Sequence, residues 1–315
     1  MIAGFAAAGV LTLSVPAGAG AIGSSVLEIF DFQLRHAGGG AQLTLAGAGN
    51  PGGDITVIQG NSTAGIGVGL NGVNVAAASP AVPSALPPYG AIDLAQQCLG
   101  PGCSPFGENM YGSIGQVAPP TSTYVVGDMV MSGSMFDASA LGGPAGGSTV
   151  RTRADVSIFS GTNDGSSSSS GGADVAARLT ANQNMDVEFS FDFAMSLLAF
   201  LDTSEPDTSG NTQSATAWSL SIVQLSNPLN RLNYSPSELQ QTINLSVDAN
   251  IPLVDSGSLV SGIFTMLAGQ TYQLSVNQQS RANATLFVPE PGMLALFGAG
   301  LLLVGFTTTY RRRSS

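Results

Sequence analysis

The sequence contains no lysine, one histidine, one tryptophan and two cysteines, and only 9% of its 315 residues are charged. Its nine basic residues are all arginines, and 20 acidic residues outnumber them, so the formal net charge is −11. A chain of this charge repels the phosphate backbone of a nucleic acid, whose recognition requires a basic surface. Nucleic acid is therefore excluded as a partner.

Side chains with catalytic chemistry are equally scarce. His36 precedes a glycine-rich stretch, so a Ser-His-Asp site would have to be assembled entirely by folding, and we expect an exposed histidine without a catalytic role. Glu188 and Asp192 are the best candidates for the two carboxylates that glycoside hydrolysis needs across a cleft. Because we expect both on the solvent face of a strand, we predict no enzyme and no cofactor, and an anchored secreted hydrolase is the least favoured alternative.

Metal binding stays open at this stage. Carboxylate and amide oxygens, which calcium prefers, occur in two stretches, neither with the spacing of a dedicated calcium loop. The candidates are Asn163-Asp164-Gly165, and Asp202, Glu205 and Asp207 with Asn211.

The two cysteines lie close together. Cys98 and Cys103 flank Leu99-Gly100-Pro101-Gly102, a sequence that favours a turn. In an exported protein, an even and closely spaced pair predicts a local disulfide. The alternative is a metal site, which needs further ligands in a neighbourhood that has no histidine.

Alternation of apolar and polar residues predicts antiparallel strands in the second half of the chain. One face is apolar and the other polar, as in sheets with one solvated face. A carbohydrate-binding module is a second alternative, but it needs a platform of exposed aromatic residues. Trp218 is in phase with the apolar set, which places it in the core. The apolar positions are Val187, Phe189, Phe191, Phe193 and Met195; Trp218, Leu220 and Ile222; Ile243, Leu245 and Val247; Tyr272, Leu274 and Val276; and a short final strand over residues 284–288.

The first half of the chain is rich in glycine, which leaves strand register weakly specified. We expect strands over residues 55–59, 66–75, 124–131 and 150–159, a proline-rich connector over 76–88, and a mobile loop over the serine tract 161–172. Ser235-Pro236-Ser237-Glu238 fits a capping box with proline at the first helical position and predicts a turn or two of helix. The predicted fold is mainly β, an antiparallel two-sheet β-sandwich of jelly-roll type with long loops.

The N-terminal segment has the pattern of a secretory signal peptide. Residues 3–15 are apolar, Pro16 interrupts them, and Ala17-Gly18-Ala19 or Ala19-Gly20-Ala21 offers a small-residue cleavage site. No basic residue precedes Arg35, so the positive region of a signal peptide is missing, and the true start lies upstream or the chain is slightly truncated. We assign residues 1–21 to a signal helix and residues 22–287 to an extracellular β domain.

Residues 288–315 form a three-part tail. Pro289-Glu290-Pro291 is followed by 18 uncharged residues, 293–310, and then by Arg311, Arg312 and Arg313. As a helix, 18 residues span about 27 Å, close to the roughly 30 Å hydrocarbon core of a bilayer. We therefore predict one transmembrane helix that contains Met293, Leu301, Leu302 and Leu303, with the arginines holding its end in the cytoplasm.

This tail resembles the PEP-CTERM sorting domain of Gram-negative bacteria, in which the triplet, the span and the basic end occur in this order. The resemblance implies recognition of Pro289, Glu290 and Pro291 by a membrane-embedded exosortase, which processes the protein near the triplet. It also implies a transient stay in the inner membrane and delivery to the cell surface or extracellular matrix.

Residues 189–282 resemble, more loosely, a group of exosortase-dependent surface proteins of unknown activity, through Phe191, Ala217-Trp218-Ser219 and 267–272. That resemblance implies a sandwich and no particular chemistry. The expected function is that of a non-enzymatic surface or matrix protein that contacts exopolysaccharide.

Overall fold

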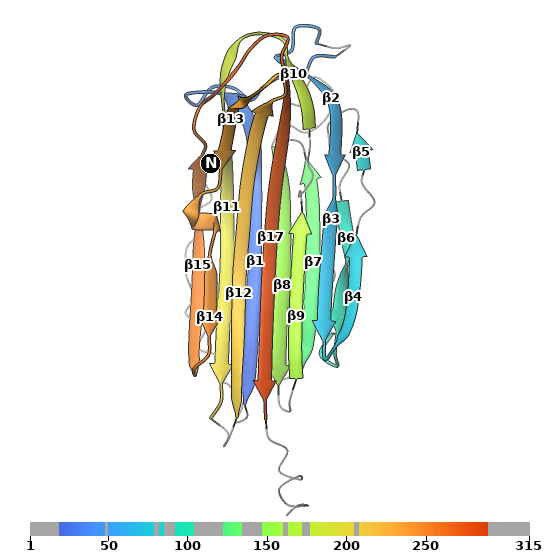
Figure 1. The fold of residues 1–315 in the computed structure, drawn as a ribbon, viewed down its shortest axis with the longest axis vertical. Coiled ribbons are helices and arrows are strands. Elements are labelled where there is room, and N and C mark those ends of the chain that lie inside the picture. Colours follow the sequence, from blue (N-terminus) through green and yellow to red (C-terminus); the bar gives the residue numbers. More distant parts are fainter. Residues whose placement is uncertain are drawn as a thin grey trace, which may run out of the picture.

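The structure, a computed structural model, describes residues 19–47, 50–78, 82–84, 92–103, 122–133, 147–159, 163–171, 177–204 and 208–288. In these ranges the chain forms two antiparallel sheets that pack face to face into an elongated sandwich (Figure 1). The mainly β character and the two antiparallel sheets are confirmed. The sheets hold seven and ten described strands, more than the eight strands of a jelly roll.

The seven-stranded sheet is built around β1. Its order is β15 (Ala249–Val260), β11 (Met185–Asp202), β1 (Gly20–His36), β8 (Ser148–Phe159), β7 (Tyr124–Gly133) and β6 (Ile92–Leu99), and β16 (Phe264–Met266) pairs with the start of β11.

The ten-stranded sheet is built around β17. From one edge its order is β4 (Val73–Ala78), β3 (Ala64–Leu70), β9 (Asn163–Gly171) and β17 (Thr271–Phe287), followed by β12 (Ser209–Gln224) with β13 (Asn227–Tyr234) and β14 (Thr242–Leu245) beside it. The start of β17 also pairs with β10 (Ala177–Ala181), which continues to β2 (Ile55–Ser62) and β5 (Val82–Ser84).

The predicted alternation holds in the long strands. β11 buries the row from Val187 to Met195, β12 buries the row that contains Trp218, and β17 buries the row that starts at Tyr272. At 16 to 18 residues, these strands are about three times the usual length. Residues 284–288, expected to form a separate strand, instead continue β17 up to Phe287.

β1 is the central strand that the sequence pattern did not indicate. Residues 20–27 are all buried, and the residues of β1 that join the main core, Ala21, Leu27 and Ile29, are followed by Phe32 and Leu34, one position out of phase. A bulge between Phe30 and Gln33 absorbs the extra residue, and Asp31 adopts φ of 52° there, a conformation that Asp tolerates better than most residues. The bulge keeps both apolar stretches facing the core.

The two sheets approach each other closely near Gly23. A Cβ added to Gly23 would lie 2.6 Å from the carbonyl oxygen of Gln213 on the opposite sheet. Around it, hydroxyl groups cross between the sheets: Ser25 Oγ donates to the Ala215 carbonyl (2.6 Å) and Thr212 Oγ1 donates to the Ile22 carbonyl (2.8 Å). Buried hydroxyls are stabilising only when they are paired in this way.

The other half of the sandwich is filled by aromatic rings. Phe32 stacks on Phe189 with centroids 5.8 Å apart, and Phe191 lies against Trp218 at 4.6 Å. Tyr234 on β13 closes the cluster with an edge contact to Trp218 at 6.2 Å. Trp218 is thus buried in the core, as its phase predicts.

The serine tract does not form the expected loop. Residues 163–171 form β9, whose two neighbours are β3 and β17. Small residues are needed here because side chains of the other sheet reach this strand: a Cβ added to Gly165 would lie 2.8 Å from Val156 Cγ1. The backbone of this serine strand pairs with both neighbouring strands, and at Gly165 an apolar side chain from the opposite sheet fills the space next to the strand.

Residues 66–75 form a hairpin rather than one strand. β3 ends at Leu70 and β4 begins at Val73, and Asn71 and Gly72 between them have φ of 50° and 78°. Positive φ at both positions is the signature of a two-residue type I′ turn, for which Asn-Gly is preferred.

Two smaller predictions near the end of the chain also need correction. The expected helix is a single 3-10 turn, Ser237–Leu239, in which Pro236 is the N-cap and makes no side-chain cap. Val247 is exposed, outside β14, although Ile243 and Leu245 alternate as expected.

Both ends of the described domain lie at one end of the sandwich, which we call the junction pole. Gly20 at the start of β1 pairs with Asp202 at the end of β11, and Phe287 at the end of β17 pairs with Ser209, the first residue of β12. β11 and β12 follow each other directly in the chain, so all four residues belong to the same pole, at the bottom of Figure 1.

The packing of β11 gives a test of the fold. Phe191 is only 2% exposed and lies against Trp218, so Phe191→Ala should lower the free energy of unfolding by about 3–5 kcal/mol, the usual result of deleting a buried phenylalanine. The adjacent Asp192 points to the other face and accepts a hydrogen bond from Ser258 in an exposed pair. Asp192→Ala should therefore change stability little, and equal effects of the two substitutions in denaturant melts would contradict the assigned facing.

Candidate functional site

The outer face of the ten-stranded sheet is a flat polar surface. Along β12 and β17 the outward residues alternate with the buried rows, and the register sets Ser219 opposite Asn277 and Ser221 opposite Ser275. Further along the same two strands, Asn283 Nδ2 donates to Gln213 Oε1 (2.9 Å). Hydroxyl and amide groups therefore form rows across neighbouring strands.

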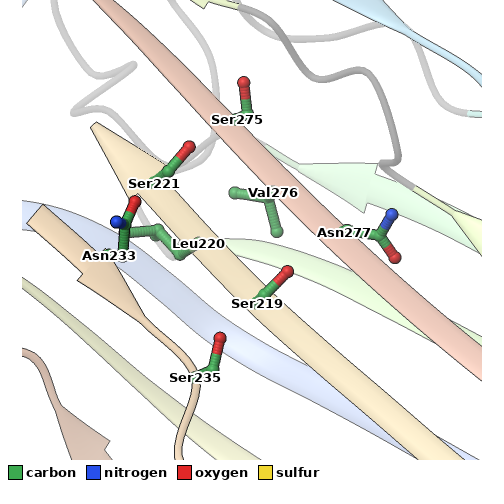
Figure 2. Close-up of a pocket in the computed structure, with 8 residues that line it drawn as sticks. All are labelled: Ser219, Leu220, Ser221, Asn233, Ser235, Ser275, Val276 and Asn277. Carbon is green, nitrogen blue, oxygen red and sulfur yellow. The ribbon is translucent and has the colours of Figure 1, made fainter. Parts of the chain in front are cut away.

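A shallow depression of about 240 Å³ lies in this face where β12, β13 and β17 meet (Figure 2). Its lining combines hydroxyl and amide groups with two apolar residues, Leu220 and Val276, which belong to the buried rows. None of the lining residues is charged or aromatic. The polar lining residues are Ser219, Ser221, Asn233, Ser235, Ser275 and Asn277.

The depression offers hydrogen-bond donors and acceptors without an ionised group. Serine hydroxyls both donate and accept, and the asparagine amide does each through a different atom. Such a lining suits a neutral ligand with many hydroxyl groups.

His36 is partly buried rather than exposed, and it is not isolated. Its Nε2 atom lies 3.4 Å from Asp54 Oδ2, and Asp54 also accepts hydrogen bonds from the backbone N–H and the hydroxyl of Thr44 (2.9 and 2.8 Å) and from Gln183 (2.6 Å). Burial raises the pKa of Asp54, but these hydrogen bonds and His36 outweigh it and hold the pKa below its ordinary value. The cluster ties the 36–54 segment to the sheet.

Glu188 corrects the expectation of a solvent-facing acid. It is buried, its Oε1 accepts from Arg35 Nε and from the Gly39 N–H (both 2.9 Å), and its Oε2 accepts from the Gly38 N–H (3.1 Å). Burial opposes ionisation, but the two backbone N–H groups and the Arg35 guanidinium outweigh it and lower the pKa of Glu188. Glu188 therefore anchors the turn after β1 and is not positioned opposite a second carboxylate.

A second buried charge, on β8, was not anticipated from the sequence. Asp155 accepts a hydrogen bond from Ser24 Oγ (2.5 Å) and forms an ion pair with Arg153, and all three side chains are buried. The signal in the sequence is the Arg-x-Asp spacing, which puts both side chains on one face of a strand. A buried pair of this kind is costly to break because one charge is left without a partner.

The structure describes only some of the candidate calcium ligands, so calcium binding stays a prediction. Asp164 is exposed on β9, where it pairs with Thr285 of β17, and Asp202 lies at the junction pole and accepts from the Ser204 N–H (3.0 Å). Glu205 and Asp207 lie outside the described residues. Among the described residues no three His, Cys, Asp or Glu side chains form a metal-binding group.

Cys98 and Cys103 form a disulfide with Cα atoms 5.6 Å apart. The intervening turn requires glycine at position 100, where φ is 107° and an added Cβ would lie 2.5 Å from the Thr123 carbonyl oxygen. The bond closes the turn at the end of β6, and the pairing of Leu99 with Val125 holds that end beside the start of β7.

Pro289, Glu290, Pro291, the apolar segment and Arg311–Arg313 all lie outside the described residues, as does the segment 1–18. In the described ranges no helix is long and apolar enough to cross a membrane. What the structure fixes is the start of the tail: Phe287 is the last residue of β17, and Val288 still packs against the core.

The comparisons with known proteins concern this tail. The β-sandwich belongs to a chain with a C-terminal sorting signal, because residues 287–313 match the family model of the PEP-CTERM protein-sorting motif. This motif marks exported proteins that an exosortase-type system processes and sorts to the cell envelope. No curated protein and no solved structure matches the chain.

The environment of Glu188 predicts a pH-dependent contribution to stability. A carboxylate whose pKa is lowered on folding stabilises the fold above its unfolded pKa, near the ordinary value of 4.5, and this contribution is lost as the pH falls through the folded pKa. Glu188→Gln should therefore be less stable than wild type by about 1.5–3 kcal/mol at neutral pH. The two proteins should converge at acidic pH.

Denaturant melts across the pH range measure this difference. Asp192→Asn is the matched control, because Asp192 lies on the same strand face but is more exposed and pairs only with Ser258. A gap between Glu188→Gln and wild type that stays constant with pH would assign the effect to packing rather than to ionisation.

Proposed function

We propose that this protein is a non-enzymatic surface or matrix protein of a Gram-negative bacterium, exported through a signal peptide and sorted by an exosortase-type enzyme. The observation that carries the proposal is the match of residues 287–313 to the sorting motif. In this proposal, residues 293–310 anchor the protein in the inner membrane, and the three arginines stay in the cytoplasm. Pro289-Glu290-Pro291 is the element that the processing enzyme recognises.

The start of the β domain favours one of the two signal cleavage sites. β1 begins at Gly20, and Gly20 and Ala21 both pair with β8 and β11. Cleavage after Ala19 leaves the strand whole, whereas cleavage after Ala21 removes its first two residues. We therefore place the mature N-terminus at Gly20, two residues before the boundary expected from the sequence.

The absence of an enzymatic role is supported by how the best catalytic candidates are used. His36 lies against Asp54, and Asp54 accepts a hydrogen bond from the Thr44 hydroxyl. Glu188 accepts hydrogen bonds from Arg35 and from two backbone N–H groups. Groups committed to structural hydrogen bonds are poorly placed to transfer protons.

The sorting proposal predicts a specific defect. Changing Pro289-Glu290-Pro291 to three alanines should leave export and the membrane anchor intact, because an anchor needs only apolar length and a basic end. Processing should be abolished, and the protein should accumulate in the membrane fraction with its arginines. Mass spectrometry of the C-terminus of the mature wild-type protein, from a host that has an exosortase, tests this prediction. If residues Arg311–Ser315 are still present, the tail is a plain membrane anchor and not a processed sorting signal.

For the domain itself we propose contact with exopolysaccharide through the outer face of the ten-stranded sheet. The depression lined by Ser219, Ser221, Ser275 and Asn277 carries neutral donors and acceptors, which match the hydroxyl groups of a sugar chain. It contains no charge that would have to be desolvated. Trp218 takes no part, because it lies in the core.

Binding of the processed protein to the host's own exopolysaccharide tests this role. Ser221→Asp with Ser275→Asp should weaken binding about tenfold or more, which corresponds to about 1.4 kcal/mol, because two carboxylates then require desolvation. Ser256→Asp on exposed β15 is the matched control and should bind like wild type. Equal binding by wild type, the double variant and Ser256→Asp would place the contact outside the depression. If wild type does not bind, the proposed role in exopolysaccharide binding is refuted.

A further inference from the structure

The edge strand β4 differs from the rest of the molecular surface. It is the outer strand of the β3–β4 hairpin, at the right-hand side of Figure 1, and among the described residues it pairs with β3 alone. Its sequence, Val73-Asn74-Val75-Ala76-Ala77-Ala78, contains no charge and no proline. Val73 is 58% exposed and Val75 37% exposed, so the strand presents apolar side chains to solvent, and no strand in the described ranges pairs with its outer edge.

The longer edge strands other than β4 carry residues that hinder pairing with a further strand. β15 contains Pro252, and its Asp255, which is exposed, lies opposite the core residue Met195, so an acidic side chain sits on the core-facing side of this edge. β13 contains Pro228 and Arg231. Proline on an edge and inward-pointing charge are the usual means by which proteins block edge-to-edge association.

β5 and β6 complete the comparison. β5 contains Pro83, and β6 contains Asp93. The short strands β14 and β16 also lack proline and charge, but they have only four and three residues. β4, with six residues, is the longest described edge strand without either, and an apolar edge of this length is the type of strand most prone to pair with another chain.

We propose that β4 is the contact through which two copies of this chain pair, antiparallel about a two-fold axis, so that their ten-stranded sheets join into one. The strand is self-complementary in this arrangement. With the axis passing between the two facing Ala76 residues, Val75 lies opposite Ala77 of the second copy and Asn74 lies opposite its Ala78, so each larger side chain meets an alanine. A two-fold contact uses the same patch on both copies, as in most homodimers.

Charge favours this edge over the rest of the surface. The chain has a formal net charge of −11, so two copies repel each other wherever acidic residues meet. β4 and β3 contain no acid, and the first acidic residue inward along the sheet is Asp164 on β9, two strands away. Two copies that meet at β4 bring no carboxylates into register.

The residual repulsion between the two acidic domains gives the contact a salt dependence. Charges about 10 Å apart or more are largely screened at 0.1 M ionic strength. Dimerisation through an uncharged edge therefore strengthens as salt is added, whereas a dimer held by ion pairs weakens.

The contact is small. A six-residue strand forms only a few backbone hydrogen bonds, each of modest net strength, and buries less area than a standard interface. Pairing is therefore reversible in solution and is promoted where copies are concentrated on a surface.

Sedimentation velocity of the full-length protein over a concentration series tests the proposal, at low and at moderate salt. Val75→Lys places a charge at the centre of the contact on an exposed side chain, so the domain should stay folded, which its thermal melt verifies. Val254→Lys is the matched control, because Val254 is exposed on the opposite edge strand β15. Wild type and Val254→Lys should dimerise with rising concentration, more strongly at moderate salt, while Val75→Lys stays monomeric.

Three results would overturn the proposal. Dimers that persist in Val75→Lys place the contact elsewhere, and loss of dimers in Val254→Lys alone assigns it to β15. A wild-type protein that is monomeric at every concentration assigns the β4 edge to a strand of another protein, or to none. The test does not involve processing of the tail, so its outcome is independent of the sorting proposal.

Discussion

The hydroxyl groups that cross from one sheet to the backbone of the other determine how this sandwich is built. Near Gly23 the sheets are too close for ordinary core side chains, and Ser25 and Thr212 instead donate to carbonyls of the facing strands. Every hydroxyl buried there must find an acceptor, so the register of β1 against β12 is tied to side-chain chemistry as well as to packing. The abundance of Gly, Ala and Ser in this chain is thus compatible with a rigid core.

The two halves of the sandwich are stabilised differently. Towards the junction pole, small residues and inter-sheet hydrogen bonds hold the strands, whereas the other half packs Phe32, Phe191 and Trp218 against one another. The same long strands pass through both regions. β11 shows the transition: up to Met195 its apolar side chains alternate with more polar ones, and from Ser196 to Leu201 both faces are buried.

Strict alternation made β11, β12 and β17 predictable, since each buries one unbroken apolar row. β1 was missed because its bulge at Asp31 breaks the period, and β9 was missed because its serines contribute almost no hydrophobic signal. The β3–β4 hairpin could have been predicted from Asn71-Gly72, a dipeptide that favours a tight turn. It was missed because the strand prediction for these residues relied on apolar residues alone. The hydrogen bonds of Glu188 depend on residues about 150 positions away, and no local pattern reveals them. The sorting tail was recognisable because its specificity lies in a short linear motif.

The sorting-motif match and the β domain overlap in the sequence. The family match begins at residue 287, the last residue of β17, which is still paired with Ser209. From Phe287 to Ser275 the chain runs as one continuous strand, which spans about 40 Å at roughly 3.4 Å per residue. β17 therefore sets the distance between the serine and asparagine depression and the residue at which the sorting-motif match begins.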